Sequence, residues 1–320
     1  MFWVKAKRFT IDKENLANDP GSDSYTFPSK LYLVSMLESV ISMYMNRKLA
    51  AEVGNETLEV MESGGYVLED GTHVSIEETL AHAVSETVEY PPHKDVVWAE
   101  TGQNSTVFEV TNETTLNAVT RLVEQGYHVG ALNFASAKNP GGGFLGGSRA
   151  QEESLARSSG LYNCIKDCDM YTYHRSMKSC LYSDYVIVSP HVPVFRHDDG
   201  SLLTQPYLCT FLTSPAVNAG VVRKRREATA AKIKEVMWKR TEKVLTLAAQ
   251  FECEALVLGA WGCGVFRNDV ATIAELFEDH LLGIFQGVFK HITFAILDSS
   301  KQERFIGPFK KTFGHCKQPS

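Results

Sequence analysis

The chain has 320 residues and a mass of 35.6 kDa, which allows one large domain or two of ordinary size. Hydrophobic residues make up 44% and charged residues 22%, a balance that excludes an intrinsically disordered or collagen-like protein. The net charge of −6 provides no overall positive field, so we expect neither direct nucleic-acid binding nor attraction to an acidic membrane. Any anionic ligand must therefore be held by local groups.

The cysteine pattern and the absence of long apolar segments indicate the cellular location of the protein. The seven cysteines are an odd number without a C-x-x-C pair, which favours reduced thiols over a disulfide framework or a zinc site. Cys164 and Cys168, four residues apart, are the alternative as a metal-binding pair. The N-terminus lacks an apolar core of signal-peptide length, and polar residues interrupt the most apolar window, 31–45. We expect an intracellular protein, cytoplasmic or nuclear, that is not secreted, has no membrane contact and needs no cofactor or metal.

The first ninety residues predict a mainly helical segment. Apolar residues at helical spacing indicate an amphipathic helix over 29–53. A small hairpin is predicted next, with a strand at 57–61, a break at 64–65 and a turn at Asp70-Gly71, followed by a helix over 77–87. The stop at Pro91-Pro92 is our domain boundary. It separates an N-terminal helical extension with a small hairpin, residues 1–92, from a second domain, residues 93–320.

Beyond this boundary, strands and helices alternate. The predicted strands lie at 105–110, 127–135, 185–189, 207–213, 254–259 and 291–297, and the predicted helices at 113–125, 148–166, 222–250 and 268–284. This alternation predicts an α/β fold of three layers with a mixed, mostly parallel sheet. The basic run Arg223 to Arg226 opens one helix, either as a solvated face or as a patch that follows phosphates.

Two of the predicted strands lead into a glycine-rich loop and then a helix. The first loop runs from Asn139 to Gly147 and the second from Gly259 to Phe266. Glycine lets the backbone approach a ligand and present successive N–H groups, and the following helix N-terminus adds positive partial charge. Either loop alone could be only a tight turn. Together on one sheet they suit a diphosphate.

One known nucleotide-binding pattern matches the first loop. Gly141-x-Gly143-x-x-Gly146 fits the dinucleotide fingerprint, with acidic Asp167 and Asp169 farther on, so an NAD-dependent oxidoreductase is one alternative. The match follows an Asn-Pro that ends the strand early, and both acids fall in the same predicted helix rather than after a second strand, which argues against it.

The residues after the first loop carry the candidate chemistry. Ser148 and Gln151 form a capping box that predicts a helix from residue 148 and places Glu152 and Glu153 in its first two turns. Acids in a first turn are ordinarily partners of the helix dipole. Beside a loop that binds an anion, however, a carboxylate is unfavourable unless the chemistry requires it.

The order of these residues resembles a known family. Gly141-Gly142-Gly143, seven residues and then Gln151-Glu152-Glu153 is similar to the GGG…QEE signature of poly(ADP-ribose) glycohydrolases, and the flanking blocks 132–140 and 155–162 resemble the microbial-type branch. Similar blocks, including 256–266, extend over roughly residues 35–300. The sequence departs from the usual pattern after Phe266, where Arg267-Asn268-Asp269-Val270 replaces Gly-Asn-Asp-Pro.

The resemblance implies a macrodomain-like fold and a hydrolase. It implies cleavage of the ribose–ribose O-glycosidic bonds of poly(ADP-ribose) on modified proteins, with ADP-ribose as product and no metal, as in ADP-ribosylation reversal and the DNA damage response. It assigns Glu153 as the catalytic acid/base and Glu152 as its ribose-positioning neighbour. The candidate ligand-binding residues are Asn133, Asn139, Gly141, Gly142, Gly143, Gln151, Gly262, Gly264, Val265 and Phe266. The two asparagines could instead cap turns.

A non-catalytic macrodomain that only reads ADP-ribose is the other alternative. Binding alone gains nothing from two acids beside a diphosphate, so the intact Glu152 and Glu153 favour the enzyme.

Overall fold

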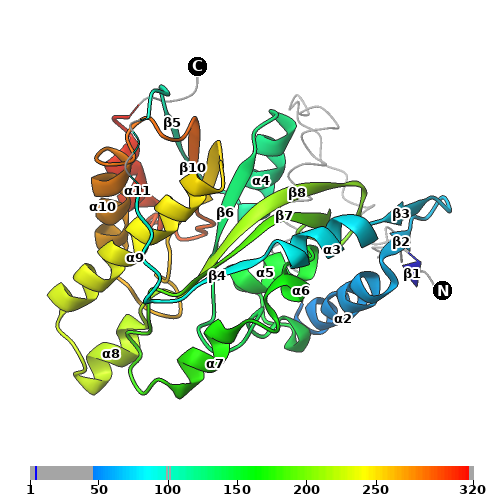
Figure 1. The fold of residues 1–320 in the computed structure, drawn as a ribbon, viewed down its shortest axis with the longest axis horizontal. Coiled ribbons are helices and arrows are strands. Elements are labelled where there is room, and N and C mark those ends of the chain that lie inside the picture. Colours follow the sequence, from blue (N-terminus) through cyan, green and yellow to red (C-terminus); the bar gives the residue numbers. More distant parts are fainter. Residues whose placement is uncertain (1–3, 6–45, 99, 101, 317–320) are drawn as a thin grey trace, which may run out of the picture.

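The computed structural model describes residues 4–5, 46–98, 100 and 102–316, and a seven-stranded sheet forms its centre (Figure 1). In spatial order the strands are β4 (Val88–Tyr90), β7 (Val186–Arg196), β8 (Leu202–Ser214), β6 (Val129–Phe134), β9 (Ala255–Leu258), β10 (His291–Ala295) and β5 (Val107–Thr111). The pairs β4–β7 and β7–β8 are antiparallel, and all pairs from β8 to β5 are parallel. The predicted mixed, mostly parallel sheet is confirmed.

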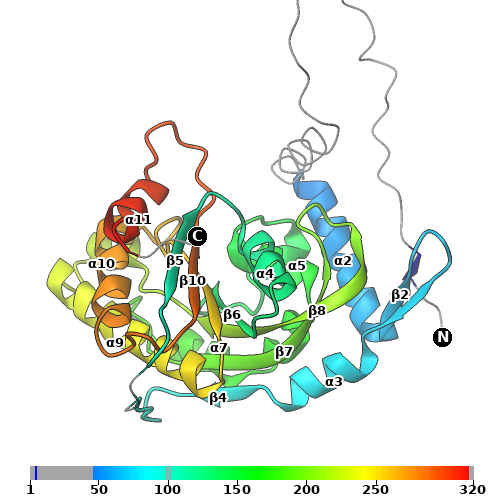
Figure 2. The same cartoon turned by 90° about the horizontal axis from the view of Figure 1, so that it is seen from above.

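Helices cover both faces of this sheet (Figure 2). On one face lie α9 (Ala230–Gln250), α10 (Val270–Leu281) and α11 (Ile306–Phe313), and on the other lie α4 (Thr115–Glu124), α5 (Gln151–Ser158) and α6 (Leu161–Ile165). Alternation along β9 explains the two cores: Leu256 and Leu258 pack under the first group, and Ala255 and Val257 under the second. The three-layer prediction is therefore confirmed.

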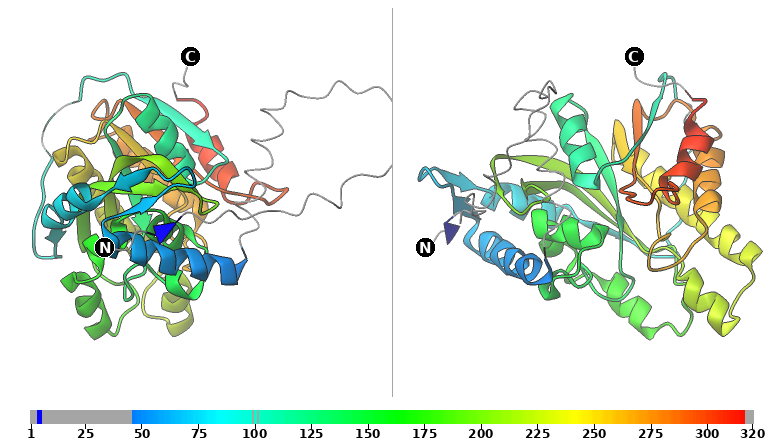
Figure 3. Two further views of the ribbon diagram at one scale, coloured as in Figure 1. Left: turned by 90° about the vertical axis from the view of Figure 1, so that its right-hand side faces the viewer. Right: turned by 180° about the vertical axis from the view of Figure 1, so that it is seen from behind.

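The N-terminal part packs against α5 and β7 (Figure 3). It comprises α2 (Arg47–Ser63), β2 (Gly65–Val67), β3 (His73–Ser75) and α3 (Glu77–Ser85), and β1 (Val4–Lys5) pairs with β2. The predicted hairpin and the helix after it are confirmed. The predicted strand at 57–61 is wrong, because these residues form the last turns of α2, with Val60 and Met61 in a small core against Tyr66. Most of the predicted helix 29–53 lies outside the described residues, and the boundary at Pro92 stays a prediction.

Two long predicted helices are each divided in the structure. The 148–166 segment forms α5 and α6, because Ser159 leaves the helix to bridge Val194 of β7. The 222–250 segment forms α8 (Ala219–Arg225) and α9, because Arg226 adopts a left-handed conformation with φ 55°. Helices α7 (Asp169–Ser176) and α11 are additional to the prediction. Among the described residues, no helix is both long and apolar enough to cross a bilayer.

Candidate active site

The two glycine loops leave the same edge of the sheet. The first follows β6 and the second follows β9, and these two strands are parallel neighbours. Their carboxyl ends therefore lie side by side, as in other α/β folds that bind ligands at this edge. The sequence placed both loops on one sheet, and the strand order brings them together.

The first loop folds tightly around Gly141 and Gly142, which have φ values of 67° and 61°. The Gly142 N–H donates to the Asn139 carbonyl oxygen at 3.0 Å, so Asn139 closes the loop through its backbone while lying exposed. A short 3₁₀ helix, η2 (Phe144–Gly146), follows with Phe144 buried. Left-handed conformations are readily adopted by glycine, which explains the glycine pair.

Both glutamates lie against this loop. The Gly143 N–H donates to Glu153 Oε1 at 3.0 Å, and the Ser136 N–H donates to Glu152 Oε2 at 2.6 Å. A Cβ atom on Gly142 would lie 2.4 Å from Glu153 Oε1 and 3.1 Å from Glu152 Oε2. The second oxygens, Glu152 Oε1 and Glu153 Oε2, are buried and have no hydrogen-bond partner in the described part of the chain. Each carboxyl group thus has one oxygen held by the backbone and one without a partner in the described part of the chain.

The two carboxyl groups differ in their surroundings. Glu152 is 4% exposed, whereas Glu153 is half-buried. Burial raises the pKa of Glu152 to about 8, against the opposing hydrogen bond from the Ser136 N–H and with a further increase from the nearby Glu153 charge. Glu152 is therefore largely protonated at neutral pH.

Gln151 fixes the start of α5 in a way that the sequence did not predict. Its Oε1 accepts the Phe134 N–H at 2.9 Å, and its Nε2 donates to the Leu132 carbonyl oxygen at 2.8 Å. The predicted capping box with Ser148 is wrong: the helix begins at Gln151, and Ala150 is the N-cap without a side-chain hydrogen bond. The amide is used to fasten α5 to the end of β6.

Asn133 lies near the end of β6, fully buried beside Glu152. Its Nδ2 donates to Thr213 Oγ1 at 3.2 Å, and its Oδ1 has no partner within the described ranges. Of the two candidate asparagines, Asn133 is the one that the structure brings to the carboxyl groups.

The second loop has a fixed base and an open tip. Asn268 Nδ2 donates to the Gly262 carbonyl oxygen at 3.1 Å and to the Val217 carbonyl oxygen at 2.8 Å. Gly264 has open space around its Cα, Val265 is 83% exposed and Phe266 is half-buried. The candidate residues at the tip are therefore free to contact a ligand, while the base is part of the protein interior.

A cavity of about 360 Å³ lies between the start of α5, the second loop and the chain that follows β10. Its apolar wall includes Phe134, Leu297 and Phe305, and its polar wall includes Glu113 and Asp198. Sequence reasoning missed this cavity, because only the position of β5 beside β10 brings residues 113 and 297 together. The sequence contains one signal for the cavity: an acidic residue, Glu113, lies two residues after the end of β5.

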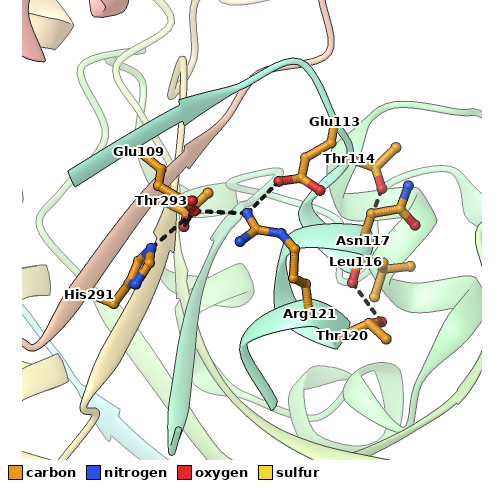
Figure 4. Close-up of polar contacts among 9 residues, drawn as sticks. All are labelled: Glu109, Glu113, Thr114, Leu116, Asn117, Thr120, Arg121, His291 and Thr293. Atoms are coloured by element: carbon orange, nitrogen blue, oxygen red, sulfur yellow. Dashed lines mark hydrogen bonds and ion pairs between the residues drawn. The ribbon is translucent and has the colours of Figure 1, made fainter. Parts of the chain in front are cut away.

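Glu113 is held at the cavity by an ion-pair network (Figure 4). Arg121 Nη2 lies 2.8 Å from Glu113 Oε1 and 2.9 Å from Glu109 Oε2. Thr293 on β10 donates to the same Glu109 carboxylate at 3.0 Å. The network joins α4, β5 and β10 and so fixes the polar wall of the cavity.

The cysteines form no site of their own. No disulfide joins any of the seven cysteines, all of which lie in the described part of the chain, and burial raises the pKa of Cys164 to about 11 and that of Cys168 to about 12. Within the described ranges, no group of three or more His, Cys, Asp or Glu side chains could hold a metal ion.

The matching family model and two of the matching solved structures are those of poly(ADP-ribose) glycohydrolases. The family model for the catalytic domain of microbial-type poly(ADP-ribose) glycohydrolase (PARG) matches residues 54–197. The crystal structure of poly(ADP-ribose) glycohydrolase from Thermomonospora curvata is 44% identical, with a TM-score of 0.78 over 82% of this chain and 99% of that chain. The enzyme from Deinococcus radiodurans in complex with ADP-ribose is 42% identical, with a TM-score of 0.69 over 74% of this chain and 98% of that chain. No curated protein matches the sequence.

Proposed function

The chain belongs to the microbial-type poly(ADP-ribose) glycohydrolase family, and from this premise we propose how its own residues hydrolyse the ribose–ribose bonds of poly(ADP-ribose). The same family includes the Thermomonospora curvata enzyme solved with the inhibitor ADP-HPD, which is 43% identical. An ADP-ribose unit is thus the ligand that the site must hold.

ADP-ribose consists of an adenine nucleoside, a diphosphate and a distal ribose, and we assign each part to a different region of the site. We place the adenine in the cavity, where Phe134 and Phe305 supply flat apolar walls and Glu113 can accept from an amino group. The diphosphate lies between the two loops, where the glycines let the backbone approach it closely. The distal ribose then lies against Glu152 and Glu153.

Glu153 is the acid/base in this proposal. Its Oε2 protonates the departing ribose oxygen as the anomeric carbon becomes oxocarbenium-like, and the resulting carboxylate takes a proton from the attacking water. The Gly143 N–H holds Oε1 throughout and so fixes the carboxyl plane. The ligand's own diphosphate balances the positive charge that develops at the sugar.

Glu152 has the positioning role. It is protonated and buried, so its Oε1 can donate to a hydroxyl of the distal ribose without adding negative charge beside the diphosphate. Asn133 Oδ1 can accept from the same sugar.

One observation carries the proposal. Two buried carboxyl oxygens, Glu152 Oε1 and Glu153 Oε2, have no partner in the described part of the chain, and the other oxygen of each carboxyl group lies against Gly142 of the first loop. Buried polar atoms are normally satisfied, so these atoms mark the place of a polar ligand.

The experiment is incubation with polymer-modified protein, followed by mass identification of the products. Free ADP-ribose is the expected product. Unchanged polymer that stays tightly bound would contradict the proposal and identify a reader of ADP-ribose.

We also propose that the natural substrate is polymer on modified proteins inside the cell, as in the reversal of ADP-ribosylation after DNA damage. Seven cysteines without a disulfide suit a reducing compartment.

A further inference from the structure

A series of cationic side chains joins the two glycine loops along α7 and α8. We call it the basic arc, and it consists of Lys138, Arg175, Lys178, Arg223, Lys224, Arg225, Arg226 and Arg267. Figure 1 shows α7 and α8 next to each other beyond the ends of the sheet, and the reverse view in Figure 3 agrees.

Hydrogen bonds to backbone carbonyls hold the basic arc in order. Arg175 Nη1 donates to the Lys138 carbonyl oxygen at 2.6 Å, which ties α7 to the first loop. Arg223 Nη2 donates to the Arg267 carbonyl oxygen at 2.6 Å, which ties α8 to the second loop. The gap between the helices is bridged by Arg225 Nη1, 3.5 Å from the Lys178 carbonyl oxygen.

The charge of the basic arc is largely uncompensated. Seven of its members are exposed, and Lys138 is half-buried. Within the described ranges, Arg225 is the member that forms an ion pair, with Glu227 at 3.4 Å. A chain with net charge −6 therefore gathers eight cations beside its candidate active site. Like charges this close repel one another and favour an anionic ligand.

The basic arc and the cavity use different parts of the two loops. The cavity is lined by Ala150 and Gln151 after the first loop and by Ala260 and Gly264 in the second. The basic arc contacts Lys138 at the start of the first loop and, through the Gly220 N–H at 2.9 Å from the Phe266 carbonyl oxygen, the end of the second. None of the cavity-lining residues belongs to the basic arc.

We propose that the basic arc binds the diphosphates of the polymer units on the leaving side of the scissile bond. This rests on the proposed function, in which adenine occupies the cavity and the scissile bond faces Glu153. The leaving chain then departs from the ribose end of the bound unit, away from the adenine. Each unit of that chain carries a diphosphate, and Arg forks and Lys ammonium groups suit its oxygens. Tyr173, 43% exposed on α7, offers a ring on which an adenine of the leaving chain can stack.

The test compares long poly(ADP-ribose) with ADP-ribose as probes. The double variant Lys224→Gln/Arg226→Gln removes two exposed cations of the basic arc. In the Glu153→Gln background, which prevents turnover, we expect the Kd for long polymer to rise about three- to tenfold and the Kd for ADP-ribose to stay unchanged. The slope of log Kd against log salt should fall by about 1.4, since each lost phosphate contact is worth about 0.7 on a single strand. In the active background, KM for long polymer should rise with kcat retained.

A matched control removes two cations elsewhere. Lys239→Gln/Lys311→Gln, on exposed positions of α9 and α11, should leave polymer binding as in the parent. Equal polymer affinity and salt slope with and without the two arc cations would overturn the proposal. Single-stranded DNA bound as tightly as the polymer, and lost in the same variant, would also overturn it by identifying a general polyanion surface. Because these are binding measurements, they remain decisive if the chain proves not to cleave polymer, an outcome that would contradict only the proposed function.

Discussion

Glu152 and Glu153 are neighbours in the first turn of α5, yet they cannot do the same work. Successive side chains on a helix point about 100° apart. Glu152 is held under the end of β6 by the Ser136 N–H, and Glu153 is held at the first loop by the Gly143 N–H. We therefore propose that the difference in burial separates a buried hydrogen-bond donor from an acid/base that meets the reacting bond.

Replacement of Glu153 tests its proposed role as the acid/base. Glu153→Gln keeps the side-chain shape and an acceptor for the Gly143 N–H, but it cannot transfer a proton. We expect turnover of polymer to fall at least roughly 10²-fold, because general acid–base catalysis typically supplies 10²–10⁴. Affinity for ADP-ribose should be kept. Steady-state rates and calorimetry on the same preparation measure both, and a variant with more than about a tenth of wild-type turnover would exclude Glu153 from this role.

The raised pKa of Glu152 predicts a pH-dependent stability. The folded protein keeps this proton up to about pH 8, whereas the unfolded chain releases it near 4.5. Between these values the folded state binds more protons, so the stability falls as pH rises, by up to about 1.4 kcal/mol per pH unit, and it levels off above pH 8.

Glu152→Gln removes this titration while resembling the protonated form. The unfolding free energy of the variant, measured by urea denaturation at several pH values, should exceed that of the wild type increasingly from pH 5 to 8. A constant difference between the two proteins over that range would show that Glu152 is ionised in the folded state.

At the scale of elements, the sequence predicted the strand–loop–helix order at both loops but not how the helices begin and end. The spacing of Ser148 and Gln151 fits a capping box, yet Gln151 is engaged by the backbone of Phe134 and Leu132. Ser159 interrupts a continuous helical pattern through its bridge to Val194. In both cases a partner distant in sequence determines where the helix begins or ends, and the local sequence pattern carries no information about that partner.

The cavity was missed for a related reason. Its polar wall combines Glu113 and Asp198, and its apolar wall includes Phe305, which are far apart in the chain. Their meeting depends on the strand order β7-β8-β6-β9-β10-β5, which alternation of strands and helices leaves open. The glycine and glutamate residues could be found because their spacing is local.

The geometry of the first loop predicts that Gly142 cannot be replaced without loss of function. Gly142 has φ 61°, and a Cβ there would meet both carboxyl groups, at 2.4 Å for Glu153 Oε1. Gly142→Ala should therefore displace the glutamates, lowering both ADP-ribose affinity and turnover by at least about tenfold, since backbone strain and a steric clash act together.

Gly146→Ala is the matched control for this substitution. It lies in the same loop, outside the left-handed region and with nothing within 4 Å of the added Cβ. Equal binding constants for the two variants would show that the loop tolerates a side chain beside the carboxyl groups.

At the scale of the whole molecule, the arrangement explains how a chain of net charge −6 can bind an anion. The parallel strands β6 and β9 end at one edge, where the two glycine loops lie side by side, and the start of α5 adds positive partial charge. Protonation of Glu152 removes one negative charge from this place. Binding therefore depends on local dipoles rather than on the overall field.

The same arrangement predicts discrimination between ADP-ribose and NAD, which share an adenosine diphosphate and differ at the anomeric carbon of the distal ribose. In the proposed orientation that carbon faces Glu153, which lies against the backbone of Gly142 and Gly143. The polymer carries its leaving ribose on the α face of this carbon and NAD carries its nicotinamide on the β face, so a site that accommodates the leaving ribose does not accommodate the nicotinamide. ADP-ribose should raise the unfolding temperature, since a ligand at 100 times its Kd adds about 2.7 kcal/mol to the stability. NAD at the same concentration should give a much smaller shift, and AMP, which reaches only the cavity, an intermediate one. Thermal unfolding monitored by tryptophan fluorescence, with calorimetric titration of each ligand, measures the order. Binding of NAD as tightly as ADP-ribose would mean that the distal ribose does not face the glutamates, and the orientation of the ligand would have to be abandoned.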